Sequence, residues 1–271
     1  MTAVNDATGS VGRSWITELL PYRADGDTFI APQPPAGPGL RLFGGLIAAQ
    51  SLAAAGATVD PDKLPHSLHA YFVRGGDYGV EVDLHVERTR DGRSFATRRF
   101  TAVQQGRAIL ELMASFARPE PGTDWHPPVE PSLPFDVAVP KEPDIPSAEK
   151  FELRAHPDDD SEFAVPPFWI RTRDEIEDDP LIRACMLTFM SDIGPVPAGR
   201  PPGVPMSFGA RFAASLDHSV WFHRPFHPRR WHRYEVSAVN NVSSRGLVVG
   251  GLYDEDGTLI ASVSQEALLR L

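Results

Sequence analysis

Hydrophobic and polar positions alternate along this chain with two different periods. Residues 44–59, GGLIAAQSLAAAGATV, are small or apolar at nearly every position. This run is too long for an ordinary strand and is rich in alanine, the strongest helix former, so it predicts a helix that is buried on all sides. Residues 80–90 instead alternate strictly, with apolar side chains at 80, 82, 84 and 86. That period of two is typical of a half-buried strand.

A run of predicted strands follows the helix, at residues 67–76, 80–90, 94–103 and 108–116. Asp91-Gly92 and Gln105-Gly106 supply the turns between the later strands. Strands and helices do not alternate, which argues against a doubly wound parallel fold. An antiparallel sheet wrapped around one apolar helix is the simplest packing solution, and it belongs to the α+β class.

The second half of the chain repeats this order. A helix is predicted at residues 181–192, and strands at 215–226, 234–242, 243–257 and 258–271. Phe72 and Arg74 recur 150 positions later as Phe222 and Arg224. The turn glycine Gly106 recurs 151 positions later as Gly257. The matching order favours an internal duplication. Two such units can pair their sheets edge to edge, which removes an exposed edge.

Proline marks the boundary between the two units. Of 27 prolines, nine lie between Pro119 and Pro146. Because proline fixes φ and lacks the N–H donor, this stretch predicts an extended linker rather than a helix or a central strand. The expected organisation is an N-terminal unit at 1–118, a linker at 119–150 and a C-terminal unit at 151–271.

Composition removes several classes of function. The formal net charge of −10 argues against a sequence-independent nucleic-acid binder. No run of 18 apolar residues is present and the N-terminus has no apolar signal core, so neither a membrane span nor secretion is expected. The single cysteine, Cys185, excludes an internal disulfide and a cysteine-based zinc cluster, and it fits a reducing cytoplasm. The histidines show no ligand spacing, so no metal site is expected.

Three motifs together resemble the acyl-CoA thioesterase II family. They are R-D-G-x-S-F at 90–95, D-H-S-x-W-F-H-R-P at 217–225 and S-x-x-Q-E at 262–266. The resemblance covers most of residues 14–118 and 165–271. It implies a double hotdog fold and the hydrolysis of fatty acyl-CoA to a free fatty acid and coenzyme A without a cofactor. It also implies a homodimer or homotetramer.

The resemblance further implies that three residues of the C-terminal unit hold and activate the attacking water. These are Asp192, Ser215 and Gln265. Ser215 stands where the family commonly has threonine, so the hydroxyl is kept. The residues themselves add one observation: Gln265 shares a strand face with apolar residues at 259, 261 and 263, where a polar side chain needs a partner.

Other residues are candidates for binding the substrate. Gly44 and Gly45 precede a helix, where backbone N–H groups can cradle an oxyanion. Since the chain is net negative, the phosphates of coenzyme A require a local basic patch, for which Arg224, Arg229 and Arg230 are candidates. Leu46 stands where the family commonly has glutamine, so any polar contact made there is expected to be missing.

Two other functions remain open. The departures at Leu46 and Ser215 are compatible with an acyl-CoA binding protein that does not hydrolyse its ligand. Asp217 and His218 are the residue types of the acid–base pair that an enoyl-CoA hydratase of the wider hotdog group uses. Neighbours along a strand face opposite sides of a sheet, however, so a structural role is expected for both.

Overall fold

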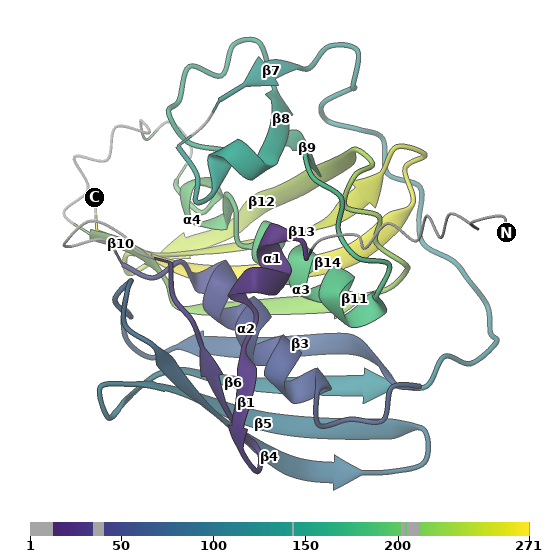
Figure 1. Ribbon diagram of the computed structural model, residues 1–271. Helices are drawn as coiled ribbons and strands as arrows, with labels where there is room; N and C mark the ends of the chain where they lie inside the picture. Colours follow the sequence, from purple (N-terminus) through teal and green to yellow (C-terminus); the bar gives the residue numbers. More distant parts are fainter. Residues whose placement is uncertain (1–12, 35–40, 143, 202–203, 205–211, 271) are drawn as a thin grey trace, which may run out of the picture.

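The strands of this protein form one antiparallel sheet that curves around its helices (Figure 1). The computed structural model describes residues 13–34, 41–142, 144–201, 204 and 212–270. The N-terminal half contributes β1 (Tyr22–Asp25), β2 (Thr28–Ala31), β3 (Leu64–Phe72), β4 (Val82–Asp91), β5 (Phe95–Gln104) and β6 (Arg107–Ala117). The C-terminal half contributes β7 (Val139–Lys141), β8 (Phe151–Ala155), β9 (Phe168–Thr172), β10 (Phe212–Ser215), β11 (Asp217–Phe222), β12 (His232–Val242), β13 (Arg245–Asp254) and β14 (Leu259–Arg270).

The two halves meet in the middle of this sheet. The strand order is β1-β2-β4-β5-β6-β3-β11-β14-β13-β12-β9-β8-β7, with β10 paired to β14. The seam between the halves is the β3–β11 pair, in which His69 lies opposite Ser219. These two residues are 150 positions apart, the same offset that relates the two halves of the sequence. The pairing therefore confirms the predicted duplication and places its approximate twofold axis at this residue pair.

Two antiparallel helices fill the concave side of the sheet. They are α2 (Gly44–Gly56) and α3 (Pro180–Ser191), and α1 (Trp15–Leu19), α4 (Pro195–Ala198) and the 3-10 turn η1 (Ala148–Lys150) are short. Residues 45–55 of α2 are all buried, as their composition predicts. Asp179 caps the start of α3, because its carboxylate accepts the N–H groups of Leu181 and Ile182 at 2.8 and 3.0 Å.

Glycine allows the two helices to approach closely. An added Cβ at Gly45 would lie 2.6 Å from the carbonyl oxygen of Phe189 in α3. At the other end of α2, an added Cβ at Gly56 would lie 2.6 Å from the side chain of Leu181. The start of α2 therefore lies beside the end of α3, a contact that brings the two halves of the chain to one place.

Several predicted boundaries are corrected. The first helix ends at Gly56 rather than 59, and β3 spans Leu64–Phe72 rather than 67–76. The predicted strand 215–226 is two strands, because an extra residue near Leu216 interrupts its pairing with β14. Ser215 lies opposite Ala267, whereas Ser219 lies opposite Ser264. This irregularity is a β-bulge, a feature that re-aims side chains and that hydrophobic periodicity does not predict.

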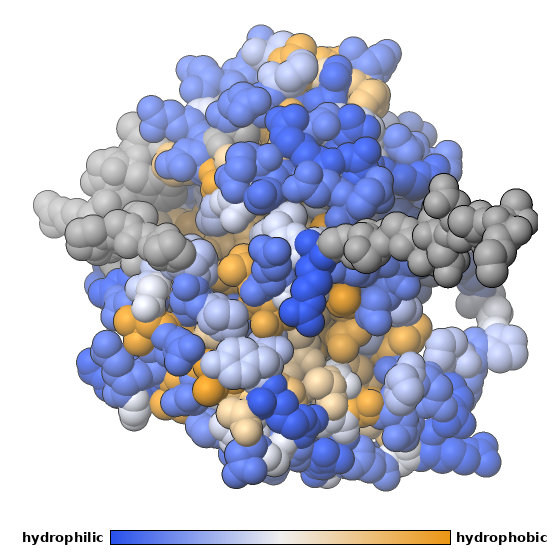
Figure 2. Space-filling model, in the orientation of Figure 1, coloured by the Kyte–Doolittle hydropathy of each residue, from blue (hydrophilic) through white to orange (hydrophobic). Residues whose placement is uncertain are grey.

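The sequence prediction missed the hairpin β1–β2 and the strands at the opposite edge of the sheet. The edge strand β7 falls within the proline-rich stretch 119–150 and contains Pro140, which an edge strand tolerates because one side of it needs no ladder donor. Viewed from the helix side, the surface is mostly hydrophilic, with hydrophobic residues showing mainly in the lower, N-terminal half (Figure 2). Within the described residues, no helix has the length and hydrophobicity that crossing a membrane requires.

The close contact at Gly45 makes a stability prediction. Gly45→Ala forces a Cβ against the backbone of α3, so it should lower the free energy of unfolding by about 1–3 kcal/mol. The matched control is Gly122→Ala, where an added Cβ meets nothing within 4 Å. Urea denaturation of both variants measures the effect. Equal midpoints for the two variants would show that the helices relax without cost.

Candidate active site

The contact between the two helices holds a buried carboxylate. Asp192 directly follows the last residue of α3 and is 6% exposed. The backbone N–H of Gly45, at the start of α2, donates a hydrogen bond to this carboxylate. The adjacent Gly44 has room for no side chain, because an added Cβ would lie 2.7 Å from Oδ2 of Asp192. The positive end of the α2 dipole therefore faces the Asp192 side chain.

Side chains from β10 and β14 complete the surroundings of this carboxylate. The Gln265 amide nitrogen donates to the Ser215 hydroxyl oxygen at 2.8 Å and also to Asp192. The Ser215 hydroxyl donates to Oδ1 of Asp192, with 3.5 Å between the two oxygen atoms. The structure thus brings together the three side chains for which the sequence predicts a shared role.

The bulge in the strand that precedes β11 makes this grouping possible. In a regular strand, residues 215 and 218 would lie on opposite faces of the sheet. The extra residue between them turns both toward Gln265, whose amide contacts Ser215 on one side and His218 on the other. The expectation that Asp217 and His218 point apart agrees with their partners, since Asp217 accepts the backbone N–H of Glu266 at 2.6 Å.

A buried histidine fixes the orientation of the Gln265 amide. His218 is fully buried, with Nδ1 2.6 Å from Oε1 of Gln265 and Nε2 2.8 Å from the Ser191 hydroxyl. Burial lowers the pKa of His218 to about 4, so the ring is neutral near pH 7. With the Gln265 oxygen facing it, Nδ1 carries the single ring proton, and Nε2 faces the Ser191 hydroxyl, whose one proton has a second acceptor in the Thr188 carbonyl oxygen at 3.0 Å. The Gln265 nitrogen is therefore held toward Asp192.

Burial also shifts the ionisation of the carboxylate itself. Desolvation raises the pKa of Asp192 to about 7, against the opposing hydrogen bonds from Gln265, Gly45 and Ser215. Tyr234 is buried beside this position and donates to the Ser191 carbonyl oxygen, which anchors the end of α3. A carboxyl group with a pKa near neutrality can accept and return a proton at physiological pH.

The other half of the duplication lacks every one of these groups. The residues at the equivalent places in the N-terminal half are Ala57 for Asp192, Pro65 for Ser215, Leu68 for His218 and Ala114 for Gln265. Glycines 44 and 45 correspond to Asp179 and Pro180 at the start of α3. The polar cluster therefore occurs once, although the fold repeats twice.

A cavity of about 800 Å³ opens beside Asp192. Its walls come from both halves of the chain and include Gly44, Phe72, Ser215 and Leu268. Three arginines, at 41, 74 and 107, line it together with Tyr78. Arg224, Arg229 and Arg230 are not among its lining residues, and each is paired with a carboxylate elsewhere, from Asp124, Glu175 and Glu255 respectively.

The other residues that the sequence predicts near the substrate lie at different depths around this cavity. Gly44 lines the cavity, whereas the Gly45 N–H is engaged by Asp192. Leu46 is 2% exposed and packs in the apolar core, so its side chain does not line the cavity. Sequence reasoning missed Phe72 and Tyr78 as lining residues, because nothing in the hydrophobic pattern distinguishes them from core aromatics. Among the residues that the structure describes, no cluster of three or more His, Cys, Asp or Glu side chains is placed to hold a metal ion.

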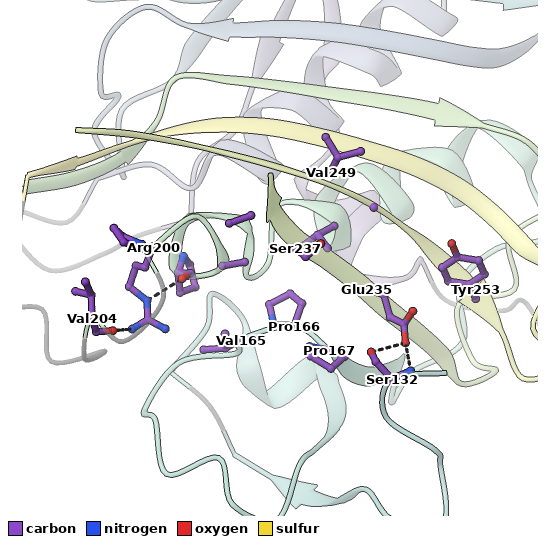
Figure 3. A pocket seen from close by; sticks show the side chains of 16 residues that line it. Ser132, Val165, Pro166, Pro167, Arg200, Val204, Glu235, Ser237, Val249 and Tyr253 are labelled. Atoms are coloured by element: carbon purple, nitrogen blue, oxygen red, sulfur yellow. Dashed lines mark hydrogen bonds between the residues drawn. The ribbon is translucent and has the colours of Figure 1, made fainter. Parts of the chain in front are cut away.

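A second cavity of about 580 Å³ lies against β12 and β13 (Figure 3). Its polar groups are largely satisfied within the protein. Glu235 accepts from the backbone N–H and the hydroxyl of Ser132, both at 2.8 Å, and Arg200 donates to the carbonyl oxygens of Pro197 and Val204. It contains none of the predicted catalytic residues, so the cavity at Asp192 is the stronger candidate for catalysis.

Comparison with known proteins places this chain among acyl-CoA thioesterases. The family model described as acyl-CoA thioesterase matches residues 161–268, and the one described as its N-terminal domain matches 32–117. Mouse acyl-coenzyme A thioesterase 8 is 37% identical over 259 residues, which are 85% of this chain and 81% of that protein. Acyl-CoA thioesterase 2 of Haemophilus influenzae is 32% identical over 253 residues, covering 85% and 88%.

Solved structures lead to the same family. The acyl-CoA thioesterase II TesB2 of Mycobacterium marinum superposes with a TM-score of 0.80 at 33% identity, covering 94% of this chain and 96% of that one. A hot dog fold protein of Alicyclobacillus acidocaldarius, 17% identical, superposes with a TM-score of 0.70 over 92% and 95% of the two chains, which confirms the fold alone. The chain belongs to the acyl-CoA thioesterase family. Its double hotdog fold is the one predicted.

The buried carboxylate makes a prediction about stability and pH. The pKa of Asp192 is raised in the folded protein, so the unfolded chain binds fewer protons between about pH 4 and pH 7. Folding therefore loses stability as the pH rises through this window, and the loss is complete above pH 7. Asp192→Asn removes the ionisable group. Relative to the wild type, the unfolding free energy of the variant should therefore rise by about 2–4 kcal/mol between pH 4 and pH 8.

Denaturation in urea across this pH range measures the difference. The matched control is Asp83→Asn, because that carboxylate is exposed on β4 and no described residue pairs with it. A difference between wild type and Asp192→Asn that does not change with pH would mean that the carboxylate ionises as readily folded as unfolded.

Proposed function

We propose that this protein hydrolyses fatty acyl-CoA thioesters with a water molecule activated by Asp192. One observation carries the assignment. A buried carboxylate with a pKa of about 7 lies at a cavity. It is held by donors from both halves of the chain, one of which is at the start of α2. General-base assistance is most effective when the pKa of the base is close to the working pH, and it contributes roughly 10²–10⁴-fold to the rate.

The three polar side chains have separate tasks in this mechanism. Asp192 accepts a proton as water attacks the thioester carbonyl carbon, so that a C–O bond forms and the carbonyl oxygen becomes an oxyanion. Ser215 and Gln265 offer a hydroxyl and an amide N–H, which orient the water. When the tetrahedral intermediate collapses, the C–S bond breaks and the sulfur of coenzyme A takes the proton from Asp192. The products are a carboxylic acid and a free thiol.

The start of α2 favours the charged intermediate. Backbone N–H groups in the first turn of a helix have no intrahelical acceptor, and the helix dipole adds a positive potential. The Gly45 N–H supports Asp192, which leaves Gly44 as the candidate oxyanion donor of the two predicted glycines. Loss of one such donor costs on the order of 3 kcal/mol of transition-state stabilisation.

The contacts of Asp217 and His218 favour hydrolysis over the hydration of an enoyl-CoA. Asp217 accepts a backbone N–H, and both ring nitrogens of His218 are engaged by Ser191 and Gln265. Neither side chain lines the cavity beside Asp192. For the acyl chain, the same cavity offers apolar walls from Leu42, Ile47 and Ile109. The homodimer or homotetramer and the cytoplasmic location remain predictions.

Release of coenzyme A, followed with a thiol reagent over saturated acyl-CoA substrates from short to long, tests the proposed function. The wild type should release thiol and Asp192→Asn should lose at least 100-fold in kcat, because the base contributes about that much. Asp83→Asn is the control and should match the wild type. Thiol release by Asp192→Asn at the wild-type rate would contradict the role of Asp192.

Binding of acyl-CoA without thiol release, seen by calorimetry, would instead indicate the non-hydrolytic binding protein. An absorbance change with an enoyl-CoA and no thiol release would indicate the hydratase. Thiol release and the absorbance change with an enoyl-CoA together therefore distinguish the three functions.

The pH dependence of hydrolysis follows from the pKa of Asp192. Only the ionised carboxylate can accept a proton, and burial raises its pKa to about 7. The value of kcat/KM should rise about tenfold per pH unit below this pKa and level off above it. A pH–rate profile from pH 5 to pH 9 measures the inflection. A flat profile down to pH 5 would exclude Asp192 as the base with that pKa.

A further inference from the structure

Three arginines line the cavity beside Asp192, and they differ in how their charges are compensated. Arg41 pairs with Asp77 at 2.9 Å. Arg74 and Arg107 are exposed, and within the described part of the chain no carboxylate lies within 4.0 Å of either guanidinium. In a chain with a net charge of −10, two uncompensated guanidinium groups at one cavity mark a local site of positive charge.

The position of Arg74 is rigidly defined by its neighbours. The backbone N–H groups of Val73 and Arg74 donate to the Ile109 carbonyl oxygen at 2.9 and 3.2 Å. Nη1 of Arg74 donates to the Ala108 carbonyl oxygen at 2.9 Å. One edge of the guanidinium is therefore fixed to β6. Its other edge, formed by Nε and Nη2, has no partner among the described residues.

The duplication supplies an internal comparison for this arginine. Arg224 is its counterpart in the C-terminal half, and its backbone is held in the same way. The N–H groups of His223 and Arg224 donate to the Ile260 carbonyl oxygen at 2.9 and 3.2 Å. Nη1 of Arg224 donates to the carbonyl oxygen of Leu259, the counterpart of Ala108.

The two arginines differ at the remaining edge of the guanidinium. In Arg224, Nε lies 3.0 Å from Oδ1 of Asp124, and Nη2 donates to the same carboxylate. Asp124 comes from the proline-rich stretch between the two halves. The fork of Arg224, meaning its Nε and Nη2 groups, is therefore occupied by a carboxylate of the protein itself. The same fork of Arg74 faces no such carboxylate. The Arg224 copy thus shows that this geometry accepts an oxyanion, here a carboxylate, to which both Nε and Nη2 donate.

We propose that the Nε/Nη2 edge of Arg74 binds a phosphate group of coenzyme A, with Arg107 contributing charge beside it. The inference rests on the proposed function and replaces Arg224, Arg229 and Arg230 as the phosphate contacts. In this arrangement the nucleotide end of the substrate lies over the N-terminal half, while its thioester reaches Asp192 at the end of α3. The internal carboxylate Asp124 keeps the second copy of the motif closed to the same ligand.

Kinetics of Arg74→Gln with three thioesters of the same acyl group test this assignment. The substrates are the ester of coenzyme A, the ester of 3′-dephospho-coenzyme A and the ester of pantetheine, which carries no phosphate. With the coenzyme A ester, KM should rise about 10–100-fold with little change in kcat, because a bidentate charge-assisted contact is lost. With the pantetheine ester, variant and wild type should be alike.

The middle substrate identifies which phosphate is bound. If the effect of Arg74→Gln disappears with the dephospho ester, Arg74 binds the 3′-phosphate; if it persists, Arg74 binds the diphosphate. Arg224→Gln is the matched control and should leave KM unchanged for all three esters, because its fork is already occupied. Arg74→Lys keeps the charge without the fork, so its KM should fall between those of the wild type and Arg74→Gln.

An equal rise in KM for the pantetheine ester would overturn the assignment, since the effect would then not depend on phosphate. An unchanged KM for the coenzyme A ester would overturn it as well. Failure of the proposed function is distinguishable, because the wild type would then hydrolyse none of the three thioesters.

Discussion

The chemistry proposed for this protein depends on one contact, between the start of α2 and the end of α3. Glycine at positions 44 and 45 lets the backbone of α2 approach so closely that an N–H group reaches the carboxylate of Asp192. Burial at this contact raises the pKa of the carboxylate, against the opposing hydrogen bond from Gly45. A single packing constraint therefore sets both the position of the proposed base and its proton affinity. Since α2 belongs to the N-terminal half and α3 to the C-terminal half, neither half contains the site by itself.

The polar groups around Asp192 form an ordered chain in which each hydrogen bond determines the next. The Ser191 hydroxyl faces His218, His218 donates to Gln265, and Gln265 donates to Ser215 and Asp192. Burial keeps His218 neutral, so the ring has one proton, and the Gln265 oxygen that faces Nδ1 places it there. The amide of Gln265 is fixed by the same argument. A glutamine on an apolar strand face thus obtains partners for both ends of its side chain.

The architecture was predictable from the sequence because it follows from periodicity. A helix that is apolar on all faces, followed by alternating strands and repeated in the same order, indicates a duplicated helix and sheet. The position of the candidate site was harder to predict from the sequence. The bulge that turns Ser215 and His218 toward Gln265 depends on one extra residue in a ladder, which leaves no mark on the hydrophobic pattern.

The proposed phosphate contact illustrates a second limit of prediction from sequence. Arg74 and Arg224 have similar surroundings in the sequence, and only the path of the chain through Asp124 distinguishes an occupied fork from an open one. The edge strands and the short first hairpin were missed for a related reason. Their segments are only three to five residues long, and their pairing is decided by the sheet rather than by local propensity.

The twofold arrangement of the sheet has a consequence for how the two halves have diverged. The seam at His69 and Ser219 requires both halves to keep the same strand geometry, because each supplies one side of the ladder. The places equivalent to the polar cluster carry Ala57, Pro65, Leu68 and Ala114, so the N-terminal half has become a structural partner that contributes a helix terminus and a cavity wall. Under the proposed mechanism, turnover depends on how the two halves pack together: a ligand or substitution that separates α2 from α3 by about an ångström would stop the reaction while every strand remains in place.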